Sequence, residues 1–232
     1  QEFPRVFRRR FRYFLAAAVF FLVPALAAGV SCHRNHELVF SILDDQQVSR
    51  VESMYDPAAR PPDRSEKRGS DTDLAMFGFY IKNNIGIGFR TFAGGILAGA
   101  GTLFFLAYNG LMLGGIAGHL TRIGFGETFW PFVSGHGAFE LTAIVISGAA
   151  GFMLAKELIA PGRYRRVDAL KNAAPEALKL MMGAACMLVM AAFVEAFWSS
   201  SAFPDAVKYS VAAVLWGLVG AYLLLAGTGR RS

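Results

Sequence analysis

Long apolar blocks separated by shorter polar stretches dominate the chain, and they cover residues 14–30, 91–118, 132–154, 180–198 and 207–225. Their apolar residues run together and do not recur at the spacing of a half-buried helix or strand. A helix needs about 20 apolar residues to cross a bilayer, and these blocks reach or approach that length. The pattern predicts an all-α fold, a polytopic membrane helix bundle that forms a single integral membrane domain over residues 1–232.

The second block, 91–118, is longer than one crossing requires and contains many glycines. Asn109-Gly110 in its middle predicts a break into two half-helices. Glycines four residues apart let helix backbones approach closely. They predict helix packing within the bundle, and a homodimer through the same faces, at Gly95, Gly99, Gly110, Gly114 and Gly118.

The polar stretch 32–77 lies between the first two blocks and predicts an extracytoplasmic loop inserted into the bundle. Within it, apolar positions over 37–55 predict a short amphipathic helix. A cluster of prolines at Pro57, Pro61 and Pro62 predicts a loop. Residues 74–89 mix aromatic and polar side chains, so we expect a segment lying at the lipid–water boundary.

Basic residues flank the blocks, and in short loops such residues face the cytoplasm. This predicts a cytoplasmic N-terminal region with an attached first helix, a cytoplasmic 156–179 connection and a cytoplasmic C-terminus carrying Arg230 and Arg231. An odd number of crossings must then lie between residues 77 and 156, where only two blocks are found. Either the glycine-broken 91–118 region is re-entrant, or residues 74–118 contain two crossings, or the rule fails here, so we expect five or six membrane segments. The first residue is Gln1, which predicts that an N-terminal portion precedes it.

The composition and charge of the chain exclude several classes of function. The chain is 54% hydrophobic and 17% charged, against about a quarter charged in soluble proteins, and this excludes a soluble enzyme. The net charge of +6 is spread over block ends, so it predicts contact with lipid head groups and no nucleic-acid partner. We expect the head-group contacts at Arg163, Arg165 and Arg166. No nucleotide-binding loop or nucleophile motif occurs, and we expect no catalytic residue, cofactor or metal.

Four polar side chains inside the apolar blocks are the candidate site: His136, Glu140, Glu195 and Asn109. Ionisable groups at membrane depth cost about 2.5–3.5 kcal/mol each, so they predict a buried polar cluster. His136 and Glu140 are four residues apart and share a helix face. The cluster could hold helices in register, relay protons or ions, or bind a metal; the metal is the weakest reading because a second histidine is absent.

Several segments together resemble the stage II sporulation protein M family: Ser134–Ile144, Gly148–Gly151, Ala160–Arg163 and Ala191–Ser199, with Asn83-Asn84 and Gly94–Gly99 in the same pattern. The similarity extends from about residue 74 onward. It implies a polytopic protein of the bacterial inner membrane whose namesake anchors peptidoglycan-degrading partners. The family's recurrent polar positions match His136, Glu140 and Glu195, and the resemblance implies no catalytic residue.

Three functional hypotheses follow. The first is a non-enzymatic scaffold or anchor of a cell-envelope complex, with unidentified envelope or cytoplasmic protein partners. The second is a transporter or lipid-handling channel, because broken helices with buried ions mark transport sites. The third, and weakest, is an intramembrane metal-dependent hydrolase built on the same residues.

Overall fold

The computed structural model describes residues 2–59 and 70–228, and all regular elements in these ranges are helical. The long helices are α2 (Phe11–Arg34), α4 (Ser70–Ala93), α5 (Ala100–Arg122), α6 (Gly126–Ile159), α7 (Arg166–Phe193) and α8 (Asp205–Leu225). The shorter elements are α1 (Glu2–Arg9), α3 (Asp45–Tyr55), the 3-10 turns η1 (His36–Ser41), η2 (Pro57–Ala59) and η3 (Gly94–Ile96), and the π-helical turn η4 (Val194–Ser199). Pro61, Pro62, Arg230 and Arg231 lie outside the described residues.

Within residues 2–59 and 70–228, five helices are long and apolar enough to cross a membrane: α2, α5, α6, α7 continued through η4, and α8. Many of their large apolar side chains face outward, as lipid-facing residues do; Val23 and Leu218 are among them. The protein is therefore a multi-pass membrane protein with an all-α bundle, which confirms the fold class predicted from the sequence.

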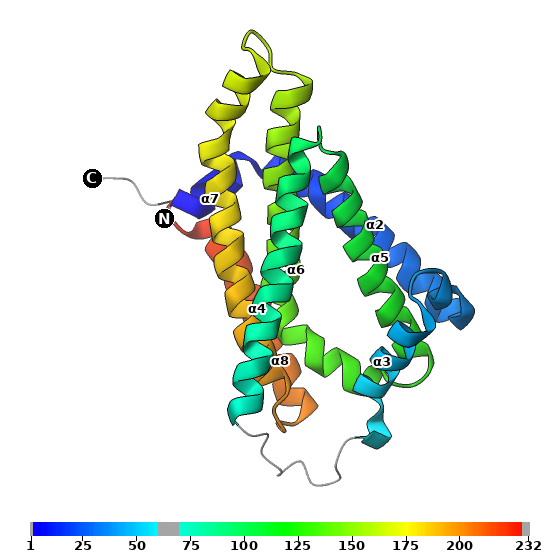
Figure 1. Ribbon diagram of the computed structural model, residues 1–232. Helices are drawn as coiled ribbons and strands as arrows, with labels where there is room; N and C mark the ends of the chain where they lie inside the picture. The colour runs from blue at the N-terminus through cyan, green and yellow to red at the C-terminus, as the bar shows by residue number, and fades with distance from the viewer. Residues whose placement is uncertain (1, 60–69, 229–232) are drawn as a thin grey trace.

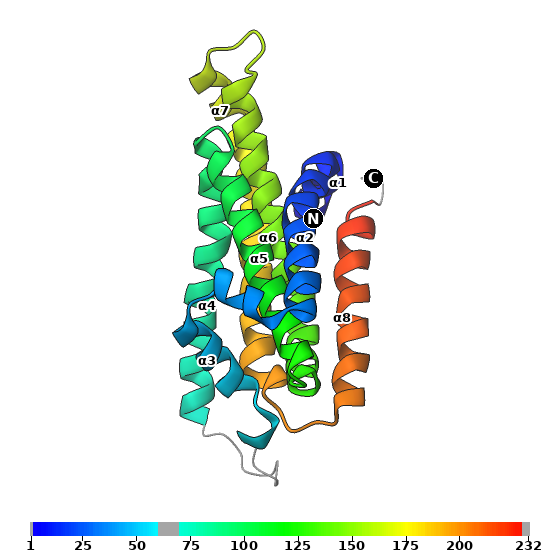
Figure 2. The same cartoon turned by 90° about the vertical axis from the view of Figure 1, so that its right-hand side faces the viewer.

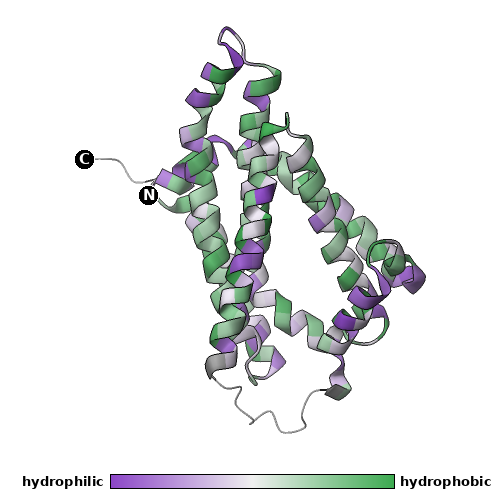
Figure 3. Cartoon of the chain, viewed as in Figure 1, coloured by the Kyte–Doolittle hydropathy of each residue, from purple (hydrophilic) through white to green (hydrophobic). Residues whose placement is uncertain are grey.

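The helices run up and down, so that polar segments gather at two opposite ends (Figures 1 and 2). One end holds α1, the end of α8 and the connection between α6 and α7. The other end holds η1, α3 and the start of α4. Hydropathy colouring places hydrophilic residues at both ends, while α4 also carries them along its length (Figure 3). The arginine-rich N-terminal segment and the basic 156–179 connection thus share one side.

Helix α4 differs from the expected boundary segment over 74–89. It is one continuous helix that packs against α6 and α7 inside the bundle and runs antiparallel to α5 (Figure 1). The boundary interpretation was wrong. Lys82 and Arg90 interrupt the apolar pattern in the sequence, but both lie on an exposed face of α4 and leave its other face free to pack. At 1.5 Å per residue this helix is about 36 Å long, enough to span the hydrocarbon core.

The reversal between α4 and α5 is where the second apolar block is broken. Ala98 and Gly99 both have positive φ, 51° and 85°, and glycine adopts this conformation without steric penalty. The expected break at Asn109-Gly110 was wrong: α5 is continuous there, and the Asn109 amide donates to the Phe105 carbonyl within the helix.

Glycines close the bundle tightly at this reversal, in a region we call the glycine vertex: Gly94, Gly95, Gly101 and Gly151. A Cβ atom on Gly95 would overlap the Gly151 backbone, and one on Gly94 would overlap Gly101. The hydroxyl of Thr102 donates to the Thr91 carbonyl across the turn at 2.7 Å. The α4–α5 turn and α6 are therefore in backbone contact.

A second close contact joins α2 and α5 along their length. Cβ atoms on Gly110, Gly114 and Gly118 would overlap the carbonyl oxygens of Phe21, Ala25 and Gly29, respectively. This spacing of four residues permits close helix approach, as the sequence indicated. Because the chain's own α2 covers these glycines, a homodimer stays a prediction that would need another face.

Away from the glycine vertex, the α2/α5 pair diverges from α6 (Figure 1). The first turns of α6 run at a steep angle to the rest of the helix. Pro131 lies there, and proline cannot donate the helical hydrogen bond, which is a common cause of kinks. The bend carries the start of α6 beneath α5 and encloses space between the helices.

The polar segment after α2 contains two elements where one amphipathic helix was expected. Asn35 begins η1, and Asp44 begins α3 with a reciprocal capping box to Gln47. Capping side chains compete with helix continuation, and this divides the 37–55 region. Val39 and Val48 are buried with Cys32 beneath this segment, so the segment packs over the end of α2 and α5.

Helix α1 joins the opposite end of the bundle. Arg9 and Arg10 both pair with Glu176 of α7, at 2.5 and 2.7 Å. The Arg8 guanidinium donates to the Leu223 carbonyl of α8 at 2.8 Å. Phe3 lies against Gly183, where a side chain would leave no space for the ring. The basic N-terminal segment is thus fastened to α7 and α8.

Candidate functional site

His136, Glu140 and Glu195 converge inside the bundle although Glu195 is more than fifty residues away in sequence. One potential ligand atom from each lies within 4.8 Å of the others. His136 Nε2 is 3.8 Å from Glu140 Oε2, as expected for residues one helical turn apart on α6. His136 is buried and the two carboxylates are half-buried. The arrangement brings an imidazole and two acids together at membrane depth.

Glu195 enters the site from the π-helical turn η4, which interrupts the end of α7. Such turns add a residue to the helix and redirect side chains, and they are frequent at functional sites. Ser199, at the end of the same turn, lies 3.0 Å from His136 Nδ1. The turn therefore supplies one acid of the cluster and holds the other side of the imidazole ring.

Asn84 of α4 completes the surroundings of the cluster. Its side chain is 2% exposed and lies within reach of the Glu195 carboxylate. Asn83 donates to its carbonyl oxygen at 3.1 Å. Its amide nitrogen is buried and has no hydrogen-bond partner of normal geometry among the described residues. Buried amide donors are normally paired, so this donor, aimed at the cluster, is an exception.

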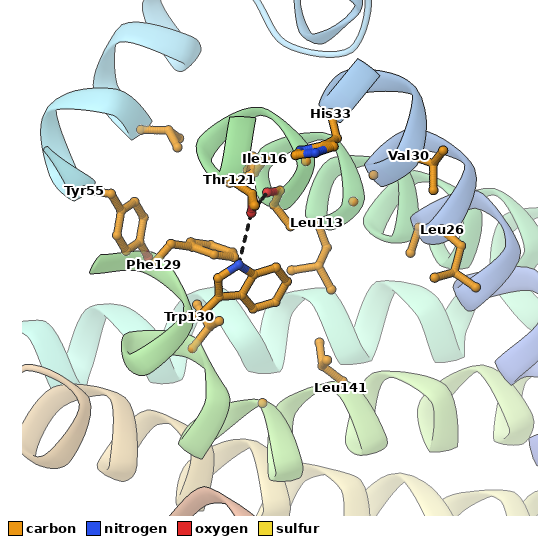
Figure 4. A pocket seen from close by; sticks show the side chains of 18 of the residues that line it. Leu26, Val30, His33, Tyr55, Leu113, Ile116, Thr121, Phe129, Trp130 and Leu141 are labelled. Carbon is orange, nitrogen blue, oxygen red and sulfur yellow. Dashed lines mark hydrogen bonds between the residues drawn. The ribbon is translucent and has the colours of Figure 1, made fainter. Parts of the chain in front are cut away.

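A cavity of about 910 Å³ borders the cluster. His136, Glu140 and Glu195 form part of its wall. Most of the rest is apolar and comes from α2, α3, α5 and the bent start of α6, with His33, Arg34 and Thr121 among the polar exceptions. Figure 4 shows Leu26, Leu113 and Leu141 facing this space, with Trp130 donating to the Thr121 hydroxyl at 3.0 Å. The cavity also reaches His33 and Tyr55, at the end that carries α3.

A second cavity of about 450 Å³ lies on the α4–α5 side. Glu140 lines both cavities, together with Leu113, Ile116 and Leu141. The polar residues of this second cavity include Asn83, Arg90 and Asn109. Glu140 thus stands in the wall that the two spaces share.

The chain matches the profile of the family described as Stage II sporulation protein M over residues 14–200. That range is most of the chain. The protein belongs to the Stage II sporulation protein M family. Comparison with curated proteins and with solved structures gave no match.

The Stage II sporulation protein M match begins in α2 and ends just after η4, so it contains His136, Glu140, Glu195, Asn84 and Ser199. Helix α8 lies outside the matched range, yet it supports the site. Lys208 donates to the Ser199 carbonyl at 2.8 Å, and Trp216 donates to the Ser134 carbonyl at 3.2 Å. A segment beyond the family region therefore holds the turn that positions Glu195.

Other predicted residues lie elsewhere. Asn109 does not join the three-residue cluster; its amide is used within α5, and it reaches the site only as part of the second cavity. Arg163 and Arg165 are exposed in the α6–α7 connection and Arg166 is exposed at the start of α7, at the same end as α1. Contact of these arginines with lipid head groups stays a prediction.

Sequence reasoning missed Asn84 and Ser199 as parts of the site. In the sequence, Asn83-Asn84 belongs to the family resemblance and to the polar residues of the 74–89 segment. A polar residue inside a helix that also carries Lys82 and Arg90 gives no signal of burial, because its neighbours are charged. For Ser199 the available signal was position: it lies four residues after Glu195, on the same side of an ordinary helix.

Proposed function

We propose that the protein binds an amphiphilic molecule of the membrane in the 910 Å³ cavity and handles it without covalent chemistry. The single observation that supports this proposal is the cavity itself. Its wall is largely apolar and includes the three convergent side chains of His136, Glu140 and Glu195. Ligand sites commonly combine a largely apolar wall with a few convergent polar groups. The proposal corresponds to the second hypothesis drawn from the sequence, a transporter or lipid-handling channel.

The chemistry of the polar end limits the occupant. Carboxylates accept hydrogen bonds, and two of them repel an anionic head group. The cluster in its metal-free form therefore suits a hydroxyl- or amine-bearing polar group. The apolar part of the molecule would lie between α2 and α5 on one side and α6 on the other, along Leu26, Leu113 and Leu141.

The test fills the cavity without removing a polar group. Val133→Trp adds a large side chain to the cavity wall, and Val214→Trp adds the same side chain to the exposed face of α8. Native mass spectrometry of the detergent-purified protein should detect a co-purifying amphiphile in the wild type and in Val214→Trp, and lose it in Val133→Trp. Equal occupancy in all three proteins would contradict the proposal.

A second candidate is the scaffold of a cell-envelope complex, and the exposed face of α4 favours it. Lys82, Asn83 and Arg90 lie exposed on a helix that packs among the membrane spans. Charged groups facing lipid are unfavourable, so a partner helix with acidic residues would stabilise them. Lys82→Leu with Arg90→Leu should abolish co-purification of that partner. Arg50→Leu on exposed α3 should retain it; equal recovery would exclude this face.

We further propose that the protein resides in the bacterial inner membrane with α1 and the α6–α7 connection in the cytoplasm. Counting α4 as a sixth crossing gives an odd number between residues 77 and 156 and satisfies the distribution of basic residues. In a protein without Cys32 and Cys186, an impermeant maleimide added to intact cells should label Gln46→Cys and not Tyr164→Cys. Labelling of the second alone would invert this orientation.

A further inference from the structure

We infer that His136, Glu140 and Glu195 form a binding site for a divalent transition-metal cation such as Zn²⁺. From the sequence we expected no metal, and a metal was the weakest interpretation of His136, Glu140 and Glu195, because a second histidine is absent. The structure brings Glu195 of η4 close to the other two residues, so that three ligands of the types that bind zinc converge, one nitrogen and two oxygens. The inference concerns the polar end of the cavity and does not depend on what occupies the apolar part.

The distances suit a cation. Ligands about 2.1 Å from a tetrahedral zinc lie about 3.4 Å from one another. His136 Nε2 and Glu140 Oε2 are 3.8 Å apart, and all three ligand atoms fall within 4.8 Å. Small rotations of the two carboxylates would bring the set to bonding distance. On the remaining side the three residues face the cavity. The cavity leaves room for a fourth ligand, either a water molecule or a polar group of the occupant.

The groups behind the ligands are arranged as they are around bound metals. A ligating histidine typically uses its second ring nitrogen in a hydrogen bond that orients the ring. Here Nδ1 lies 3.0 Å from the Ser199 hydroxyl, which leaves Nε2 for the cation. Ligating carboxylates are also hydrogen-bonded. The buried Asn84 amide, which has no partner of normal geometry, faces Glu195 and can donate to its outer oxygen.

Charge supports the same inference. Two carboxylates placed together in a low-dielectric region repel each other, and each is costly to remove from water. A divalent cation bound between them would neutralise both charges at once.

The experiment measures metal content of the full chain, purified in detergent without a histidine tag. After removal of bound metal, exposure to a small excess of Zn²⁺ and removal of unbound Zn²⁺ by gel filtration, elemental analysis should find about one equivalent per chain in the wild type. Glu195→Gln and Glu140→Gln should each lose most of it. His119→Gln is the matched control, because His119 also pairs with a carboxylate, Glu52, at 2.7 Å, yet belongs to no three-ligand cluster among the described residues.

A second measurement separates a metal site from a folding defect. Zn²⁺ should raise the thermal unfolding temperature of the wild type and of His119→Gln, and leave that of Glu195→Gln unchanged. Ser199→Ala should weaken zinc affinity by about 10- to 100-fold while the protein still folds, as expected for an orienting partner. Wild-type protein that binds no zinc, or zinc retained equally in both glutamine variants, would overturn the inference. Amphiphile binding in the cavity could still stand.

Discussion

The two ends of the space between α5 and α6 are built on opposite principles. At the glycine vertex, Gly95 and Gly151 bring backbones into contact and no side chain separates them. Toward the other end, Gly137 has only the side chain of Leu141 near the place where its Cβ would be, and a cavity opens beside it. Glycine therefore does two different things in one bundle: it closes helices together, and it leaves space beside His136.

The comparison also explains where the ionisable groups are tolerated. Close backbone packing excludes both water and bulky polar side chains, so the vertex uses only a short hydroxyl, that of Thr102. The diverging region has room for Glu140 and Glu195 and for partners such as Ser199. Membrane helices associate through packing and hydrogen bonds. Here each kind of interaction dominates a different region.

The largest expected effect on stability comes from a substitution that disrupts packing at the glycine vertex. Gly95→Ala places a Cβ into the Gly151 backbone and should lower the free energy of unfolding by about 2–3 kcal/mol, as overpacking does. Gly137→Ala adds the same atom where its nearest contact is 3.8 Å away, and should change stability by less than about 1 kcal/mol, with helix propensity in its favour. Thermal unfolding in detergent measures both. Equal losses would show that the two regions are packed alike.

A smaller effect of opposite sign tests the polar cluster. Replacing Glu140 and Glu195 together by methionine removes the buried carboxylates and keeps similar volume. Exchange of buried ionic groups for apolar ones is often neutral or stabilising, so we expect unfolding free energy to stay unchanged or rise by about 1 kcal/mol. A marked loss of stability in denaturant or thermal unfolding would indicate that the cluster holds the helices in register.

The smallest effect concerns the α1 attachment. Glu176→Gln removes the acid that pairs with Arg9 and Arg10, and exposed pairs contribute about 0–1 kcal/mol. We expect a loss in that range that shrinks as salt is added, because screening weakens surface pairs. Glu157→Gln is the control, since Glu157 pairs only with its neighbour Lys156 among the described ion pairs. A salt-independent loss would point to packing instead.

Prediction from the sequence succeeded where one apolar block makes one helix. The blocks at 132–154 and 207–225 lie within α6 and α8, and their composition alone requires membrane helices. It failed for α4, because Asn84 and the charges beside it hide a buried face that exists only when α6 and α7 pack against it. It also misplaced the break, which the positive φ of Gly99 sets and Asn109 does not.

For the candidate site, the spacing of His136 and Glu140 was readable because helical geometry is local and regular. Their proximity to Glu195 depends on the π-helical turn η4, which the residue pattern of α7 does not predict. The burial of the Asn84 amide nitrogen next to Glu195 likewise becomes visible only in the packed bundle.

The amino-acid sequence by itself determined that this chain is a membrane protein, because apolar blocks of that length are suited to a lipid environment. It also identified His136, Glu140 and Glu195 as the ionisable residues inside those blocks. Only the tertiary structure decided which of them meet and what space they face. Helix contacts, bends and cavities arise from side chains far apart in the sequence, and their positions depend on how closely each pair of backbones can approach.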